Sequence, residues 1–229
     1  FGLNRIISTA VSLRQFEQGQ LSIVCLPVFS QSLLPSACRR FLERFPAVGI
    51  SITPQESPLL EEWLSAQRYD FGLTEVGHAP QGTEVNPLMM LDEVCVLPDG
   101  HPLLAKSQLS PEDFEGQSFV SLSAADSYRQ QFDQIFGEAG ITRRMVMETH
   151  SAASICAMVR EGIGLSIVNP LTALDYAGHG VHIRRFSISV PFSISIVRPI
   201  HRPPSRLVTI FESSLGEQVA IIKAKLSSW

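Results

Sequence analysis

The sequence predicts an α/β protein made of two lobes, because short apolar segments alternate with amphipathic segments in two successive series. The apolar segments have the length of buried β-strands, whereas the amphipathic segments repeat their apolar residues at helical spacing. Short links between such elements are typical of parallel strands joined by right-handed crossovers. A length of 229 residues suits two small lobes in one chain.

The first series follows Gly19, which ends an amphipathic segment at residues 1–18 that resembles the end of a longer helix. We interpret the chain as a fragment because it starts within that segment and lacks an initial Met. A strand is expected at 21–26. The helix that follows should end at Pro46, since a proline restricts the residue before it. Its apolar face is formed by Leu34, Ala37, Cys38, Phe41 and Phe45.

Two further strands and one helix complete the first series. Strands are expected at 48–52 and 69–73, in parallel with the first. Between them, Ser57 is expected to cap a helix and Pro58 to occupy its first turn.

The second series lies between residues 93 and 197, and a last helix begins near residues 203–205. Strands are expected at 93–97, 119–122, 145–148, 165–168 and 192–197, and helices at 111–114, 126–139 and 151–161. The apolar face of the last helix is expected to return to the first lobe. The resulting assignment is 1–18 as the end of a linker helix, 19–88 with 198–229 as lobe I, and 89–197 as lobe II.

The composition limits the functions that this chain can perform alone. Hydrophobic residues make up 45% and charged residues 17%, which is typical of a globular protein. A net charge of −4 and a pI near 5.9 argue against direct binding of nucleic acid. The sequence also lacks both the Lys/Arg clusters that attract proteins to anionic membranes and an apolar run long enough to cross one.

The four cysteines have wide spacings and no CxxC pair. Each lies in an apolar segment, so we expect reduced, buried thiols and a cytoplasmic location.

No catalytic or metal-binding motif is evident. Gly162-x-Gly164 follows a helix and lacks the third glycine of a dinucleotide site, so it predicts a helix end and a tight turn. There is no GxSxG motif, and the six histidines lack metal-ligand spacing. Glu61 and Glu62 diverge on a helix and cannot act as a pair.

Polar residues follow the predicted strands, at the edge where α/β sheets bind ligands and helix N-termini present free N–H groups. Carboxylates there suit a ligand that bears ammonium groups. The alternative is that Ser30, Ser57 and Ser151 only cap helices and that His150 is structural. The predicted ligand-binding residues are Phe29, Ser30, Glu56, Ser57, Thr74, Glu75, Ser121, Ser123, Thr149, His150, Ser151 and Asn169.

The chain resembles the effector-binding domain of LysR-type transcriptional regulators over nearly its whole length. The resemblance is carried by an ordered set of segments: Gly19–Ile23, Leu34-Pro35, Phe41–Pro46, Asp70–Leu73, Leu97–Leu103 and Val159–Gly164. Segments 54–64 and 148–154 resemble the founding member of this family, which activates the diaminopimelate decarboxylase gene of lysine biosynthesis in response to diaminopimelate.

The resemblance implies two Rossmann-like lobes with a hinge, as in type II periplasmic binding proteins. It implies an effector in the cleft, diaminopimelate or a related amino acid, and neither a cofactor nor a metal. It also implies a bacterial cytoplasmic homodimer or homotetramer that contacts promoter DNA through a winged helix-turn-helix before Phe1. RNA polymerase is a further partner that the resemblance allows.

Two other classes of function remain open at the level of sequence. A transporter's solute-binding protein would have the same two lobes, but unpaired cysteines are unusual in the periplasm. A hydrolase could use Ser123 or Ser151 with His150, although no orienting acid or oxyanion loop is evident.

Overall fold

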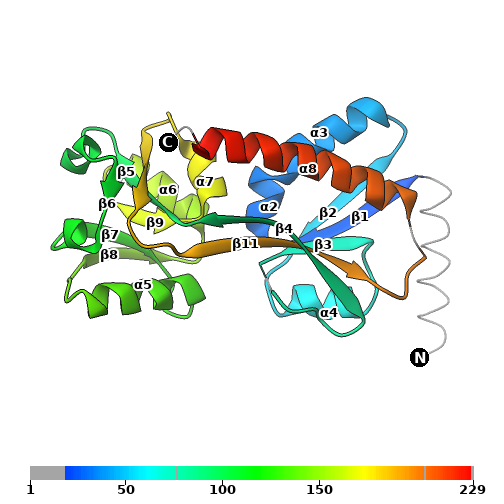
Figure 1. The fold of residues 1–229 in the computed structure, drawn as a ribbon, viewed down its shortest axis with the longest axis horizontal. Helices are drawn as coiled ribbons and strands as arrows, with labels where there is room; N and C mark the ends of the chain where they lie inside the picture. The colour runs from blue at the N-terminus through cyan, green and yellow to red at the C-terminus, as the bar shows by residue number, and fades with distance from the viewer. Residues whose placement is uncertain (1–18, 76, 204, 228–229) are drawn as a thin grey trace. The chain divides into compact units, whose positions relative to one another are not determined.

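The computed structural model describes residues 19–75, 77–203 and 205–227 (Figure 1). The linker helix predicted at 1–18 lies outside these residues. The described chain forms two compact units. Unit 1 contains the described residues through Met90 together with Ser193–Lys223, and unit 2 contains Leu91–Phe192 with the described residues from Ala224 onward. The two α/β units confirm the predicted fold class.

Unit 1 contains a five-stranded sheet in the order β2-β1-β3-β11-β4. Strands β1 (Gln20–Cys25), β2 (Gly49–Pro54) and β3 (Phe71–Thr74) are parallel, as predicted from the first series. Strand β11 (Pro191–Pro199) pairs antiparallel with β3. The sequence did not reveal β4 (Thr83–Asp92), because most of its side chains are exposed and it contains Pro87.

The helices of unit 1 are α2 (Pro27–Ser32), α3 (Leu34–Arg44), α4 (Leu59–Ser65) and most of α8 (Arg206–Ser227). The single helix predicted after Pro27 is interrupted at Leu33, which separates α2 from α3. The core of this unit contains an aromatic cluster: the fully buried ring of Phe211 packs edge-on against Phe41 and tilted against Phe71, with centroid separations of 5.3 and 5.7 Å.

The prediction that Ser57 caps α4 is wrong. The helix begins at Leu59 after Pro58, and no side chain caps its N-terminus. The hydroxyl group of Ser57 instead donates a hydrogen bond to Glu61 Oε1 at 2.6 Å. Acidic residues in the first turn, Glu61 and Glu62, offset the exposed N–H groups electrostatically.

Unit 2 contains a four-stranded sheet, β6-β10-β5-β9, and a two-stranded sheet, β7-β8. Strands β5 (Val94–Pro98), β7 (Ser118–Leu122), β8 (Arg144–Thr149) and β9 (Ser166–Val168) match predicted segments. Strands β6 (Gln108–Leu109) and β10 (Val181–Phe186) were not predicted. Polar residues alternate with apolar ones in β10, so no continuous apolar run marks it.

The helices of unit 2 enclose two apolar clusters. They are α5 (Ser127–Glu138), α6 (Ala152–Arg160), α7 (Pro170–Tyr176) and the short 3₁₀ segments η1 (Pro102–Ala105) and η2 (Pro111–Phe114). Helix α6 buries Ile155, Cys156 and Val159, as its helical spacing predicted. Gly162 ends the turn after α6 with φ of +75°, which confirms the predicted helix end.

Gly164 lies where a side chain has no space. A Cβ atom at this position would be 2.4 Å from the carbonyl oxygen of Ser118. The close approach allows Leu165 N–H to donate to that same oxygen at 2.9 Å, and it joins β9 to β7. The second glycine of the motif is therefore required for strand packing.

All four thiols are free. Burial raises the pKa of Cys25 and of Cys156 to about 12 and that of Cys38 to about 11. Cys95 is buried, and its pKa is raised in the same way. Three of the thiols are buried, as predicted, and Cys38 is half-buried.

Candidate functional site

In unit 1, the carboxyl ends of three parallel strands meet at one edge of the sheet. The register places Cys25 at the end of β1 opposite Pro54 in β2 and Leu73 in β3. Gln55 N–H donates to the Cys25 carbonyl oxygen at 2.8 Å. The residues that continue from these strands therefore start from one small region, as the strand pattern predicted.

The predicted residues at this edge differ in exposure. Thr74 ends β3 and is fully buried, Glu75 is half-buried, and Glu56 is exposed. Phe29 is fully buried in α2. Ser30 lies in the same helix, where its hydroxyl group donates to the Pro27 carbonyl oxygen at 2.7 Å, so it does not cap the helix.

In unit 2, the ends of β7, β8 and β9 form a second edge. The parallel register pairs Ser121 with Glu148 and Leu122 with Thr149. Ser166 in β9 donates its hydroxyl hydrogen to the Val120 carbonyl oxygen at 2.6 Å. The structure therefore brings together the predicted residues that follow these three strands.

Two predicted residues at this second edge also cap helices. The hydroxyl oxygen of Ser151 accepts from Ser154 N–H at 3.3 Å at the start of α6. The Asn169 side chain accepts from Thr172 N–H at 2.9 Å at the start of α7. The capping interpretation thus applies to Ser151, and it extends to Asn169. His150 is exposed, and Ser123 is 8% exposed.

Arg129 was missed by the sequence reasoning. It is the third residue of α5, and its Nη1 donates to Ser121 Oγ at 2.8 Å and to the Leu122 carbonyl oxygen at 3.1 Å. Its Nε donates to Asp133 at 2.7 Å. A basic residue in the first turn is disfavoured by the helix dipole, so its position in the sequence was a signal that could have been used.

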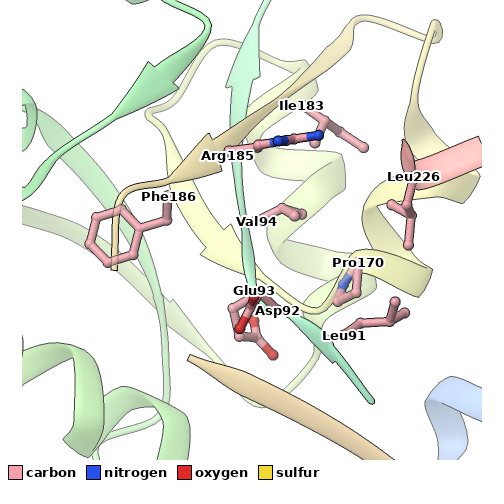
Figure 2. A pocket seen from close by; sticks show the side chains of 9 residues that line it. All are labelled: Leu91, Asp92, Glu93, Val94, Pro170, Ile183, Arg185, Phe186 and Leu226. Carbon is pink, nitrogen blue, oxygen red and sulfur yellow. The ribbon is translucent and has the colours of Figure 1, made fainter. Parts of the chain in front are cut away.

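Two cavities in the described part of the chain have other linings. A cavity of about 240 Å³ in unit 2 is lined mainly by apolar residues together with Asp92, Glu93 and Arg185. Figure 2 shows the Arg185 guanidinium beside Ile183, while the two carboxylates lie at another part of the cavity. A cavity of about 300 Å³ in unit 1 includes Arg198 and Arg202. Neither lining contains a residue predicted from the strand ends.

The described residues contain no group of three or more His, Cys, Asp or Glu side chains that could hold a metal ion. Among these residues, no helix has the length and apolar character needed to span a bilayer. Two α/β units with polar residues at the carboxyl ends of parallel strands define a ligand-binding domain.

Comparisons with known proteins identify the family. A family model described as the LysR substrate binding domain matches residues 14–220. The transcriptional activator protein LysR of Escherichia coli (strain K12) is 60% identical over 232 residues, which cover 100% of this chain and 75% of that protein. The regulatory protein NocR of Agrobacterium tumefaciens (strain T37) is 30% identical, covering 93% of this chain and 71% of that protein. HinK, a LysR family transcriptional regulator from Pseudomonas aeruginosa, has a TM-score of 0.73 at 22% identity, covering 94% of this chain and 77% of that chain.

The chain belongs to the LysR family and is the effector-binding domain of a LysR-type transcriptional regulator. This confirms the resemblance recognised in the sequence. It also favours a transcriptional regulator over the alternative of a transporter's solute-binding protein. The family consists of transcriptional regulators rather than enzymes, and its members bind small-molecule effectors and promoter DNA and form oligomers.

Proposed function

We propose that this domain senses diaminopimelate in the bacterial cytoplasm and that the whole regulator thereby activates the diaminopimelate decarboxylase gene. The 60% identity to the Escherichia coli LysR activator over the whole chain carries this proposal. The regulator would reach its promoter through a winged helix-turn-helix domain and would contact RNA polymerase there. Effector binding can shift such a regulator only if two states differ in their affinity for the effector.

The chemistry of the strand ends supports an amino-acid effector. Diaminopimelate carries carboxylate groups and ammonium groups at both ends. We assign hydroxyl groups and helix N–H groups to its carboxylates, and the acidic side chains Glu56, Glu75 and Glu148 to its ammonium groups. The hydroxyl-bearing residues assigned to the effector are Ser30, Ser57, Thr74, Ser121, Ser123, Thr149 and Ser151, with Phe29, His150 and Asn169 beside them.

The Glu56→Gln variant is expected to bind diaminopimelate about 10–100-fold more weakly, because a charge-assisted contact to an ammonium group would be lost. Calorimetric titration of this chain measures the change. Glu62→Gln removes the same charge from the exposed face of α4 and should leave the affinity unchanged. Equal affinities of wild type and Glu56→Gln would remove Glu56 from the site, and a wild type that binds no diamino acid would refute the effector assignment.

We further propose that the oligomer forms through α3 of one protomer and α6 of its partner. Ala153 and Ala157 of α6 are half-buried in the isolated chain. The adjacent strand β8 exposes Met145 and Met147 to 40% and 38%, which is an unusual exposure for such large apolar side chains. Contact between copies would remove this apolar surface from water.

Replacing both Ala153 and Ala157 by Glu is expected to raise the dissociation constant of the dimer at least about tenfold, because charges would enter the contact. Sedimentation velocity over a dilution series measures it. The matched control replaces the exposed residues Ala105 and Ala139 by Glu, with the same change in net charge. Unchanged dimers in the α6 variant at low concentration would contradict the proposed interface.

A further inference from the structure

We propose that Arg129 binds a carboxylate of the effector and that the ion pair between Asp133 and the buried Arg143 positions it for this role. This inference rests on the proposed function, since it assumes an effector that carries a carboxylate. It adds to the predicted site a cation that the strand-end pattern does not include.

Arg129 is held with one part of its guanidinium group still available. Nε and Nη1 are occupied by Asp133, Ser121 and the Leu122 carbonyl oxygen. The side chain is only 14% exposed, yet within the described residues Nη2 has neither a hydrogen-bond partner nor complete burial. Glu148 Oε2 lies 3.5 Å from Nη1, at the limit of a hydrogen bond, and its side chain is 52% exposed. Glu148 is therefore a weak partner that a ligand carboxylate could replace.

Asp133 is shared between two guanidinium groups. Its Oδ2 accepts from Arg129, and its Oδ1 accepts from Arg143 Nη2. Two cations therefore share one close carboxylate, and the second acid beside Arg129, the Glu148 side chain, makes only a 3.5 Å contact. The positive charge of Arg129 is thus incompletely neutralised at close range, which favours an incoming anion.

Arg143, the second of these two cations, is largely removed from water. Its side chain is 6% exposed, and its guanidinium carbon lies 4.0 Å from the ring centroid of Phe136 and 4.8 Å from that of Phe119. Nη1 of Arg143 is buried without a hydrogen-bond partner among the described residues. Burial lowers the pKa of this guanidinium, although arginine remains protonated at neutral pH.

This arrangement is costly if its only role is structural. Desolvating a guanidinium is unfavourable, and the first turn of α5 disfavours the positive charge of Arg129. An apolar residue packed against Phe119 and Phe136 would fill the position of Arg143 without that cost. Retaining Arg143 is explained if it draws the Asp133 carboxylate partly away from Arg129, so that Arg129 keeps its attraction for a ligand carboxylate.

The test is titration of this chain with two ligands, diaminopimelate and pimelate, which has the same carboxylates but lacks the ammonium groups. Arg129→Gln should weaken binding of both ligands about 10–100-fold, because the contact is to a carboxylate. Glu56→Gln should weaken only diaminopimelate binding. Arg129→Gln with wild-type affinity for both ligands would overturn the role of Arg129.

The positioning role of Arg143 is tested by a double-mutant cycle. Arg143→Met places a flexible apolar side chain against the two rings and should weaken binding about 3–10-fold in the wild-type background. If Arg143 acts through Arg129, it should have no further effect in the Arg129→Gln background. Equal losses in both backgrounds would show that Arg143 supports only the local fold.

The two proposals fail in different ways. A wild-type chain that binds pimelate but not diaminopimelate would refute the effector assignment, while the Arg129 variant would still test the carboxylate contact. If the wild type binds diaminopimelate and the Arg129→Gln variant binds it with equal affinity, only the role of Arg129 is refuted. Binding of neither ligand would refute both.

Discussion

Replacing Phe211 by Ala is expected to destabilise unit 1 by about 3–5 kcal/mol, because a fully buried aromatic side chain is removed and a cavity is left. The ring contacts Phe41 of α3 and Phe71 of β3, so the loss affects the packing of a helix and a strand together. Chemical denaturation followed by circular dichroism measures the free energy of unfolding.

Thr209→Ala provides the matched control for Phe211→Ala. Thr209 lies in the same helix two residues earlier, and it is exposed. Its replacement should change the free energy of unfolding by no more than about 0.5 kcal/mol. A loss of similar size in both variants would mean that α8 is sensitive everywhere, and the aromatic cluster would not be the cause.

The Gly164→Ala variant is expected to lose about 1–3 kcal/mol from the stability of unit 2. The new Cβ atom would lie 2.4 Å from the backbone oxygen of Ser118, which has no rotamer through which to move away. The strand β7 must then shift, and the hydrogen bond from Leu165 N–H to Ser118 would be distorted. Thermal unfolding of this chain, with hydrogen exchange at β7, measures the effect.

The same substitution at Gly137 should have the opposite sign. Gly137 lies in α5, and a Cβ atom there would meet nothing within 4 Å. Alanine should therefore stabilise the helix, by up to about 1 kcal/mol. Equal stability of Gly164→Ala and wild type would show that β7 and β9 can separate without cost.

Apolar runs predicted the buried strands well. In β1 and β5 nearly every residue is buried, so both strands read as continuous apolar segments. Strand β4 has mostly exposed side chains, and β10 alternates polar with apolar residues. Their places in the sheets depend on pairing with strands distant in the sequence, which a local pattern does not encode.

For the site, position along strands was more informative than residue type. Knowledge of strand ends was enough to bring Ser121 and Thr149 to one edge. It did not show that Ser57 would bond to Glu61, since a proline after serine predicts a cap equally well. Nor did it show Arg129, whose relevance depends on how a helical side chain folds back over the preceding strand.

The raised pKa values of the thiols have a practical consequence. At neutral pH, a thiol with a pKa of about 12 is ionised in only roughly one molecule in 10⁵, and the thiolate is the nucleophile. The three buried cysteines, Cys25, Cys95 and Cys156, should therefore react slowly with maleimides and disulfide reagents. Cys38 is half-buried and is the natural thiol to replace before labelling. With Cys38 replaced, a single cysteine introduced at an exposed position should carry a fluorophore selectively, and it could then report effector-induced movement in solution.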